Sequence, residues 1–362
     1  MPLRPIWRPV LERITPYDAG APIETLSAPR GGAGLVRLSA NENPLGPSPA
    51  VVAALQREAT RAHLYPDGGS TVLRAALAQR LGVAPEQILV GNGADELIML
   101  IAWAVLEAGD EVVVPHPSFE PYTTNVTLTG GTVRPSPLRG YETDLDDIRR
   151  RVTARTKAIF LCSPHNPATT IIRRGPLEQL LEALGDDSPL IVLDEAYGDF
   201  VDDPEYPDGV TLLRRHPRLL LLRTFSKIAA LAGLRVGYAI GAAEAIDRLN
   251  RVRAPFNVNR LAQAAALAAV ADDEHRTTTR AYVLAERRFM SAELQRRGLR
   301  FPASHANFLL VEVPDAATVR ARLLHEGLIV RDGAAVGFPG HLRIAIGLRE
   351  TNERVLAALD GR

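Results

Sequence analysis

Six short apolar runs between residues 88 and 240 constrain the fold of this chain more than any other feature. They are rich in leucine and β-branched residues and are apolar on both faces, which is typical of buried parallel strands. Stretches with helical spacing of apolar residues lie between several of them. This alternation predicts an α/β fold with a mostly parallel central sheet and helices on both faces. The runs are Ile88–Val90, Glu111–Val114, Ala158–Cys162, Leu190–Leu193, Leu219–Leu222 and Val236–Ile240, and the helical stretches include Glu96–Leu106, Pro176–Leu184 and Ala242–Arg253.

The pattern divides the 362 residues into three predicted segments. Residues 1–36 are expected to form an irregular N-terminal arm, and residues 37–256 a large α/β domain. Residues 257–362 are expected to form a smaller α+β domain to which the arm contributes. In this last segment we predict a long helix over Leu261–Arg297, strands at Phe308–Val313, Leu328–Val330 and Leu342–Ile346, and helices at Ala317–Glu326 and Glu350–Leu359.

Charge and cysteine content exclude several classes of protein. The 42 basic and 42 acidic side chains balance, which argues against a nucleic-acid-binding surface. The single cysteine, Cys162, cannot form an intramolecular disulfide, and no apolar run approaches the roughly 18 residues of a membrane span. We therefore expect a cytoplasmic protein. Only Lys157 and Lys227 could supply a lysine to any chemistry.

Polar residues follow four of the predicted strands, at the edge where open α/β sheets bind ligands. The first group is the run Gly91–Glu96, which has two glycines and starts a helix. Free N–H groups at such a helix start can bind an anion, although a tight turn with an N-cap explains the run equally well. In the second group Asn166 is held among prolines, as it also would be in an ordinary turn.

The other two groups carry charge. Asp194 and Tyr197 follow the fourth run, where a carboxylate at a buried strand end requires a partner, unless Asp194 only caps a helix. Lys227 follows the fifth run between apolar flanks, where poor solvation would favour the neutral, nucleophilic amine over an ordinary surface lysine. Hydroxyls and a phosphate-binding guanidinium accompany it in Thr224, Ser226 and Arg235.

One ligand explains all four groups. It has a phosphate, a carbonyl that condenses with lysine, an oxygen acceptor and a ring nitrogen kept cationic by a carboxylate. Pyridoxal 5'-phosphate (PLP) has these parts, and an aspartate at its ring nitrogen keeps the ring an electron sink. The eight histidines form no H-E-x-x-H motif and lack cysteine partners, so no metal site is expected.

The chain resembles the fold-type I PLP-dependent aminotransferases, specifically the histidinol-phosphate aminotransferase branch, from about Pro16 to its C-terminus. Leu38–Pro47 and Val252–Asn259 are similar to signatures of that branch. The resemblance implies that Lys227 forms the Schiff base and moves the Cα proton, and that Asp194 contacts the ring nitrogen. It further implies that Asn166 and Tyr197 hold the ring oxygen, that Phe119 stacks on the ring, and that Ala94, Asp95, Thr224, Ser226 and Arg235 bind the phosphate together with Tyr65 of a neighbouring subunit.

The resemblance also implies a substrate. Arg343 matches the arginine that holds the substrate carboxylate, Arg331 and Tyr17 match residues at the distal phosphate, and Asn307 falls near the substrate. The implied reaction converts L-histidinol phosphate and 2-oxoglutarate into imidazole acetol phosphate and L-glutamate, in a homodimer with shared active sites.

Departures from the family pattern keep alternatives open. His165, Ala168 and Thr169 stand in a segment that is usually Asn-Asn-Pro-Thr-Gly, and the stretch from Tyr17 to Pro22 lacks a usual proline and lysine. An aromatic-amino-acid aminotransferase and a threonine-phosphate decarboxylase-like enzyme share the same cofactor residues. A cofactor-sensing regulator is a further alternative, but it would require a DNA-binding module and a basic patch.

Overall fold

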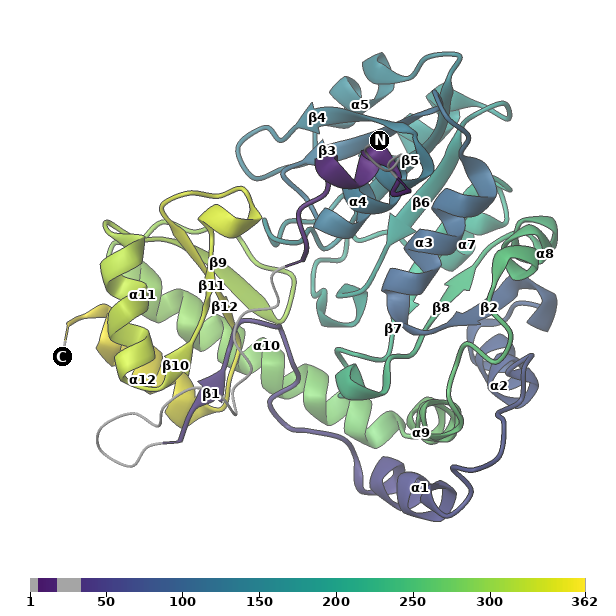
Figure 1. The fold of residues 1–362 in the computed structure, drawn as a ribbon. Helices are drawn as coiled ribbons and strands as arrows, with labels where there is room; N and C mark the ends of the chain where they lie inside the picture. Colours follow the sequence, from purple (N-terminus) through teal and green to yellow (C-terminus); the bar gives the residue numbers. More distant parts are fainter. Residues whose placement is uncertain (1–5, 18–33, 362) are drawn as a thin grey trace, which may run out of the picture.

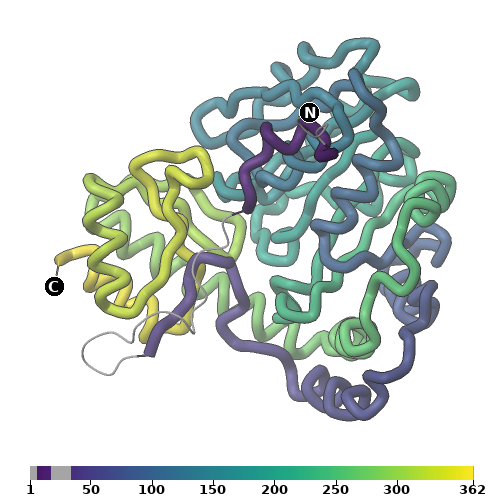
Figure 2. The backbone as a smooth tube through the Cα atoms, in the orientation of Figure 1, coloured from purple at the N-terminus to yellow at the C-terminus, as the bar shows by residue number. Residues whose placement is uncertain are grey.

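The computed structural model of the chain describes residues 6–17 and 34–361 and shows a larger and a smaller lobe (Figure 1). Of the predicted arm, residues 1–5 and 18–33 lie outside the described residues, as does most of the Tyr17–Pro22 stretch. The smooth backbone trace in Figure 2 shows the described N-terminal segment crossing from the larger lobe toward the smaller one. Residues Pro9–Arg13 form a 3-10 turn (η1), and Arg8 donates a 2.6 Å hydrogen bond to the carbonyl oxygen of Leu128.

A seven-stranded sheet in the order β2-β8-β7-β6-β5-β3-β4 forms the centre of the larger lobe. Its strands are β2 (Ile88–Gly91), β3 (Glu111–His116), β4 (Thr132–Pro137), β5 (Thr156–Cys162), β6 (Leu190–Asp194), β7 (Leu219–Thr224) and β8 (Gly237–Ile240). All neighbours pair in parallel except β8, which is antiparallel to both β2 and β7. The other six strands therefore end at one edge of the sheet, and β8 begins there. The predicted α/β fold with a mostly parallel sheet is confirmed.

Helices cover both faces of this sheet. One apolar core contains Leu97 of α3, Val126 of α4 and Ile246 of α8, and the core on the opposite face contains Ile148 of α5 and Leu177 of α6. The helices of the larger lobe are α1 (Pro49–Ala59), α2 (Thr71–Leu81), α3 (Gly93–Val105), α4 (Glu120–Thr129), α5 (Leu145–Arg151), α6 (Arg174–Leu184), α7 (Gly209–Leu213) and α8 (Ala243–Val252).

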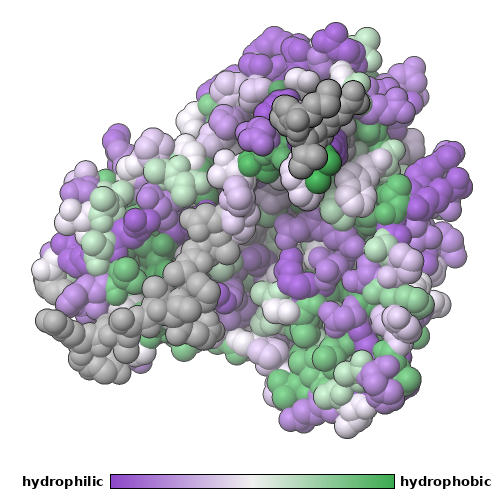
Figure 3. All heavy atoms as spheres, in the orientation of Figure 1, coloured by the Kyte–Doolittle hydropathy of each residue, from purple (hydrophilic) through white to green (hydrophobic). Residues whose placement is uncertain are grey.

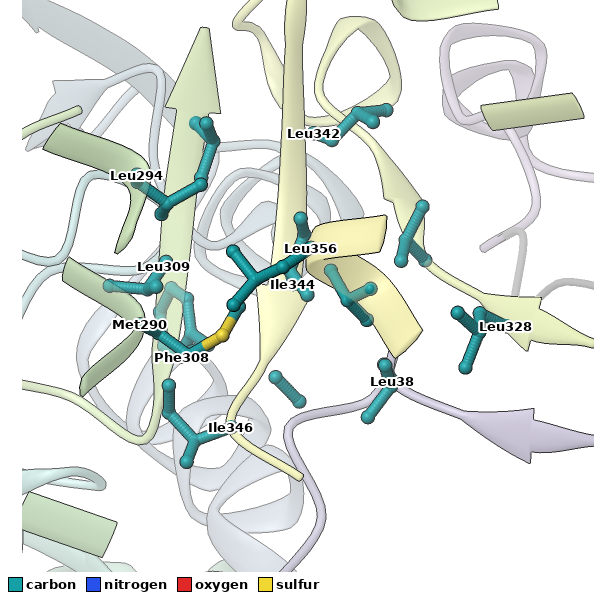
Figure 4. Close-up of a cluster of buried hydrophobic side chains, with 14 of the residues drawn as sticks. Leu38, Met290, Leu294, Phe308, Leu309, Leu328, Leu342, Ile344, Ile346 and Leu356 are labelled. Carbon is teal, nitrogen blue, oxygen red and sulfur yellow. The ribbon is translucent and has the colours of Figure 1, made fainter. Parts of the chain in front are cut away.

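The smaller lobe has its own sheet and core (Figure 4). Three antiparallel strands lie in the order β11-β12-β9, and a separate parallel pair joins β1 to β10. Leu38, Met290, Phe308, Ile344 and Leu356 are buried in the core between these strands and the helices. The elements are β1 (Val36–Arg37), β9 (Phe308–Glu312), β10 (Leu328–Ile329), β11 (Arg331–Asp332), β12 (His341–Ala345), α10 (Asp273–Arg296), α11 (Ala316–His325) and α12 (Arg349–Leu359).

The predicted long helix is divided into two. The first part, α9 (Arg260–Ala271), packs its Ala262 and Ala265 against Val51 of α1 and Leu73 of α2. A new helix, α10, begins after Asp272, whose carboxylate accepts a 3.0 Å hydrogen bond from the backbone N–H of His275. An aspartate N-cap satisfies a free N–H at a helix start, and it explains why the chain restarts there. The domain division at residue 256 stays a prediction, and the packing of α9 favours a later boundary.

On the face shown in Figure 3, hydrophilic side chains are widespread and the surface is hollowed between the lobes. No helix within residues 6–17 and 34–361 is long and apolar enough to cross a membrane.

Candidate active site

A cavity of about 260 Å³ lies at the edge where the parallel strands end. It brings together residues that are far apart in the sequence, because the loops after β2, β5, β6 and β7 all open at this edge. Residues of the smaller lobe and of the segment after β1 close its other side. The lining includes Tyr17, Ala40, Asn41, Ala94, Asp95, Phe119, Cys162, Asn166, Asp194, Tyr197, Thr224, Ser226, Lys227, Arg235 and Arg343.

Lys227 projects into this cavity from the loop after β7. Its Nζ donates a 3.0 Å hydrogen bond to the carbonyl oxygen of Ala40 and lies 5.5 Å from the centre of the Tyr197 ring. Burial, together with the positive charge of Arg343, lowers the pKa of Lys227 from 10.5 to about 8. A usable fraction of neutral amine is therefore present near neutral pH, as a nucleophilic lysine requires. The other lysine, Lys157, is half exposed beside Asp110.

Asp194, at the end of β6, is a buried carboxylate with no ion-pair partner among the described residues. Its Oδ2 accepts a 2.6 Å hydrogen bond from the hydroxyl of Tyr122, and its Oδ1 accepts one of 3.0 Å from the N–H of Ala196. Burial raises the pKa of Asp194 to about 6. A carboxylate held in this way can bind a cationic N–H group of a ligand.

Tyr122 was not among the site residues predicted from the sequence. It is fully buried, stacks on Phe160 with ring centres 4.8 Å apart, and meets Phe119 edge-to-face at 5.6 Å. Its position three residues after Phe119, on the helix that follows it, was the available signal.

The start of α3 provides an anion site. The N–H groups of Ala94 and Asp95 lie in its first turn, where they have no intrahelical partner. Arg235 contacts this turn, with its Nη2 2.7 Å from Oδ2 of Asp95. Gly93 has φ of +80°, and a Cβ there would lie 2.6 Å from Nη2 of Arg235. The positive φ favours glycine at this position, and the absence of a side chain leaves room for the guanidinium beside the loop.

Hydroxyls complete the same side of the cavity. The Oγ1 of Thr224 lies 3.0 Å from the Oγ of Ser226, and both residues line the cavity. Backbone N–H groups, two hydroxyls and an arginine form a donor set that suits a phosphate group.

Arg343, on β12, is a buried arginine without a carboxylate partner among the described residues. Its Nη1 donates to Oδ1 of Asn166 at 2.7 Å, its Nη2 donates to the carbonyl oxygen of Ser39 at 2.5 Å, and its Nε has no partner in the described chain. Burying a cation is costly unless an anion compensates it. The arginine is therefore suited to bind the carboxylate of a ligand.

A second cavity of about 250 Å³ adjoins the first and shares Tyr17, Phe119, Asn166 and Arg343 with it. Arg331 lines only this outer cavity, and its guanidinium carbon lies 5.9 Å from the centre of the Tyr17 ring. The two cavities together can hold a ligand that extends past the carboxylate-binding arginine.

Two predicted site residues do not line either cavity. Tyr65 is 77% exposed and stacks on Phe256 with ring centres 4.6 Å apart. Asn307 is fully buried, and its Nδ2 donates a 3.0 Å hydrogen bond to the carbonyl oxygen of Asn41. The roles of Tyr65 in a neighbouring subunit and of Asn307 at the substrate stay predictions.

The departures from the Asn-Asn-Pro-Thr-Gly pattern do not reach the cavities. His165, Ala168 and Thr169 are all buried, and none of them lines the cavities. Thr169 has φ of +67°, a left-handed conformation that glycine adopts readily and threonine does not. Over the described residues, no group of three or more histidine, cysteine, aspartate or glutamate side chains could hold a metal ion.

Comparison with known proteins agrees with this geometry. The family model for class I and II aminotransferases matches residues 33–359. The chain belongs to the class I and II aminotransferases. It is 43% identical, over 99% of its length and 98% of the relative's, to a histidinol-phosphate aminotransferase from an Anaeromyxobacter species. It is 41% identical to another from Moorella thermoacetica, over 98% of this chain and 92% of that one.

Solved structures extend the comparison. A histidinol-phosphate aminotransferase from Sinorhizobium meliloti in complex with pyridoxal-5'-phosphate superposes with a TM-score of 0.87 at 26% identity, covering 99% of this chain and 98% of that one. An aspartate aminotransferase from Thermotoga maritima shares the fold, with a TM-score of 0.82 at 24% identity over 91% and 92% of the two chains. The predicted fold and the predicted transaminase class are confirmed.

Proposed function

We propose that this aminotransferase uses PLP to exchange an amino group between L-histidinol phosphate and 2-oxoglutarate, producing imidazole acetol phosphate and L-glutamate in histidine biosynthesis. The observation that carries the proposal is that Lys227, Asp194 and the anion site at Gly93–Asp95 converge on one cavity. The relatives named as histidinol-phosphate aminotransferases support the choice of substrate.

The residues that line the cavity fit the proposed cofactor. Lys227 would bind its aldehyde carbon, Asp194 its ring nitrogen, and the donor set around Arg235 its phosphate. Asn166 and Tyr197 would donate to its ring oxygen, since each keeps a free donor: Oδ1 of Asn166 is already bound to Arg343, and the hydroxyl oxygen of Tyr197 accepts from Asn41. Phe119, at the junction of the two cavities, would cover the ring.

PLP, when bound, supplies an electron sink for the charge that develops at the substrate Cα. Lys227 would remove the proton from that carbon and deliver it to the former aldehyde carbon of the cofactor, acting first as general base and then as general acid. Asp194 would keep a proton on the ring nitrogen, and its burial and two hydrogen bonds hold its carboxylate in place for this task.

Arg343 and Arg331 bind different charged groups of the substrates. The buried Arg343 binds the carboxylate of glutamate or 2-oxoglutarate, and the outer cavity with Arg331 and Tyr17 accepts the phosphate of histidinol phosphate. A phosphate requires a strong cationic donor, and Arg331 provides one at the far end of the cavity.

Two further elements belong to this proposal. The active unit is a homodimer, in which the exposed Tyr65 of one subunit reaches the cofactor phosphate of the other. The enzyme works in the cytoplasm, where its single buried thiol, Cys162, requires no oxidising environment.

The test compares Lys227→Ala with Lys157→Ala, which removes the only other lysine. Borohydride should fix PLP covalently to the wild-type protein and to Lys157→Ala, and leave Lys227→Ala unlabelled and inactive. Histidinol phosphate, added without a keto acid, should then convert the bound cofactor of the wild type to its amino form, as followed by absorbance. If phenylalanine but not histidinol phosphate converts the bound cofactor, the proposed substrate is wrong. If Lys227→Ala still catalyses transamination, the proposed mechanism is wrong.

A further inference from the structure

Asn41 makes a hydrogen bond that determines how the hydroxyl of Tyr197 can be used. The Nδ2 of Asn41 donates to the hydroxyl oxygen of Tyr197 at 3.0 Å, across 156 positions of sequence. Asn41 is 1% exposed and Tyr197 is 5% exposed, and both line the inner cavity. The bond is therefore shielded from water and lies at the wall of the site.

A tyrosine hydroxyl has one proton to donate and oxygen lone pairs that accept. Because Asn41 donates to the oxygen, the proton of Tyr197 is left for another acceptor. No protein acceptor for that proton occurs among the described residues. The ring oxygen of the proposed cofactor is an acceptor of the required kind.

The structure holds Asn41 in this orientation at a cost. Its backbone has φ of +55°, a left-handed conformation that asparagine tolerates better than most residues. Asn307 donates to the carbonyl oxygen of Asn41 at 3.0 Å, and no described group donates to its Oδ1. Leu38, three residues earlier, is anchored in the core of the smaller lobe (Figure 4).

We propose that Asn41 is a positioning residue for Tyr197, because its amide occupies the acceptor side of the hydroxyl and directs the hydroxyl proton to the cofactor's ring oxygen. This inference rests on the proposed function, since it needs PLP in the inner cavity. Asn307 supports this arrangement, because its Nδ2 donates a hydrogen bond to the backbone carbonyl oxygen of Asn41.

Another explanation for Asn41 is that only its left-handed backbone matters. Asn41→Gly separates the two, because glycine adopts φ of +55° without strain and lacks the amide. Asn41→Asp provides the opposite change. Aspartate has nearly the same shape, but its carboxylate accepts a hydrogen bond from the Tyr197 hydroxyl, so the hydroxyl no longer donates to the ligand.

The experiment uses the PLP-loaded enzyme and a double-mutant cycle with Tyr197→Phe. We expect Asn41→Gly to lower kcat about tenfold, which is the effect of weakening one hydrogen bond to a charged acceptor, and Asn41→Asp to lower it further. In the Tyr197→Phe background Asn41→Gly should have no additional effect, because the hydroxyl through which it acts is absent.

A spectroscopic measurement without substrate provides an independent readout. A hydroxyl that donates to the ring oxygen stabilises its charged form, so Asn41→Gly should raise the midpoint of the pH-dependent absorbance change of bound PLP by about half a unit. The same substitution in Tyr197→Phe should leave that midpoint unchanged. Thermal unfolding of each variant checks that the fold is retained.

The outcomes are distinct. Wild-type kcat and midpoint in Asn41→Gly, or equal losses with and without the Tyr197 hydroxyl, would overturn the role of Asn41. A wild-type enzyme that binds PLP but does not react with histidinol phosphate would overturn only the proposed substrate, because the PLP titrations of the variants remain decisive.

Discussion

Nη1 of Arg343 donates a hydrogen bond of 2.7 Å to Oδ1 of Asn166, and so joins a strand of the smaller lobe to the loop after β5 in the larger lobe. The bond uses the acceptor of the Asn166 amide and leaves its Nδ2 as the donor available to a ligand. A second guanidinium nitrogen binds the carbonyl oxygen of Ser39. Arg343 thus orients Asn166, a residue predicted to bind the cofactor, and its positive charge can still bind the carboxylate of a substrate.

This arrangement makes Arg343 irreplaceable by lysine. A single ammonium cannot keep the contacts with Asn166 and Ser39 and also bind a carboxylate through two parallel bonds. We expect Arg343→Lys to raise the KM for both glutamate and 2-oxoglutarate by roughly tenfold to a hundredfold in steady-state assays. Arg331→Ala, in the outer cavity, should raise the KM for histidinol phosphate alone. Equal effects of both variants on the KM values of all substrates would contradict the assignment of the carboxylate to Arg343 and of the phosphate to Arg331.

The lowered pKa of Lys227 predicts how fast PLP attaches to the cofactor-free protein. Only the neutral amine attacks the aldehyde, and its fraction rises with pH until the pKa of about 8 is passed. Stopped-flow absorbance should show an attachment rate that rises about tenfold per pH unit below that value and levels off above it. Arg343→Met should move the midpoint upward, since the charge of Arg343 helps to lower this pKa. A rate that still climbs near pH 10 in the wild type would refute the burial of Lys227.

Tyr122→Phe tests the hydrogen bond to Asp194. The substitution keeps the ring that stacks on Phe160 and removes only the hydroxyl that donates to the carboxylate. Because a donated hydrogen bond stabilises the charged form, its loss should raise the pKa of Asp194 above its value of about 6. We expect the acid limb of the kcat–pH profile to move to higher pH and kcat at neutral pH to fall about threefold to tenfold. Superimposable profiles would show that Tyr122 contributes packing alone.

The strands could be predicted from the sequence because their signal is local. Each of the six apolar runs is a strand, and the polar residues that follow them meet at one cavity because parallel strands end together. Strand β4 was not predicted, because it contains Pro135 and Pro137 and lies at the edge of the sheet, where proline is tolerated and the alternating strand pattern is weak.

The contacts that tune the site were not predictable in the same way. Tyr122 meets Asp194 across 72 positions, and Asn41 meets Tyr197 across 156, so neither pair leaves a local pattern. The antiparallel direction of β8 likewise depends on tertiary pairing. It places Arg235, just before that strand, at the same edge as the strand ends.

The left-handed backbone of Thr169 predicts a stabilising substitution. A β-branched residue at φ of +67° is strained by about 1 to 2 kcal/mol, and its buried Oγ1 has no partner among the described residues. Thr169→Gly removes both the backbone strain and the unpartnered hydroxyl. It also removes a buried methyl group and gives the unfolded chain more conformational freedom, and both of these changes are destabilising. We expect a net gain of about 1 kcal/mol, seen as a higher midpoint of thermal unfolding. Thr170→Gly, which loses a 2.8 Å hydrogen bond to the carbonyl oxygen of Tyr141, should lower the midpoint.

His165 predicts how stability depends on pH. The ring is 1% exposed, accepts a 3.2 Å hydrogen bond from the N–H of Ala168 at Nδ1, and has no described partner at Nε2. Burial lowers the pKa of His165 from 6.5 to about 4. Between these values the unfolded chain binds a proton that the folded protein does not, so the free energy of unfolding falls as the pH drops from 6.5 toward 4.

The contribution of this one group is about 3 kcal/mol, fully present above pH 6.5 and lost below pH 4. Carboxylates also titrate in this range, so the informative quantity is the difference between the wild type and His165→Asn. Asparagine can still accept from the N–H of Ala168 but has no charge to acquire. We expect the wild type to lose more stability than His165→Asn between pH 7 and pH 4.5, as measured by urea unfolding. The exposed His63→Asn should follow the wild type, and parallel curves for all three proteins would show that His165 is protonated in the folded state.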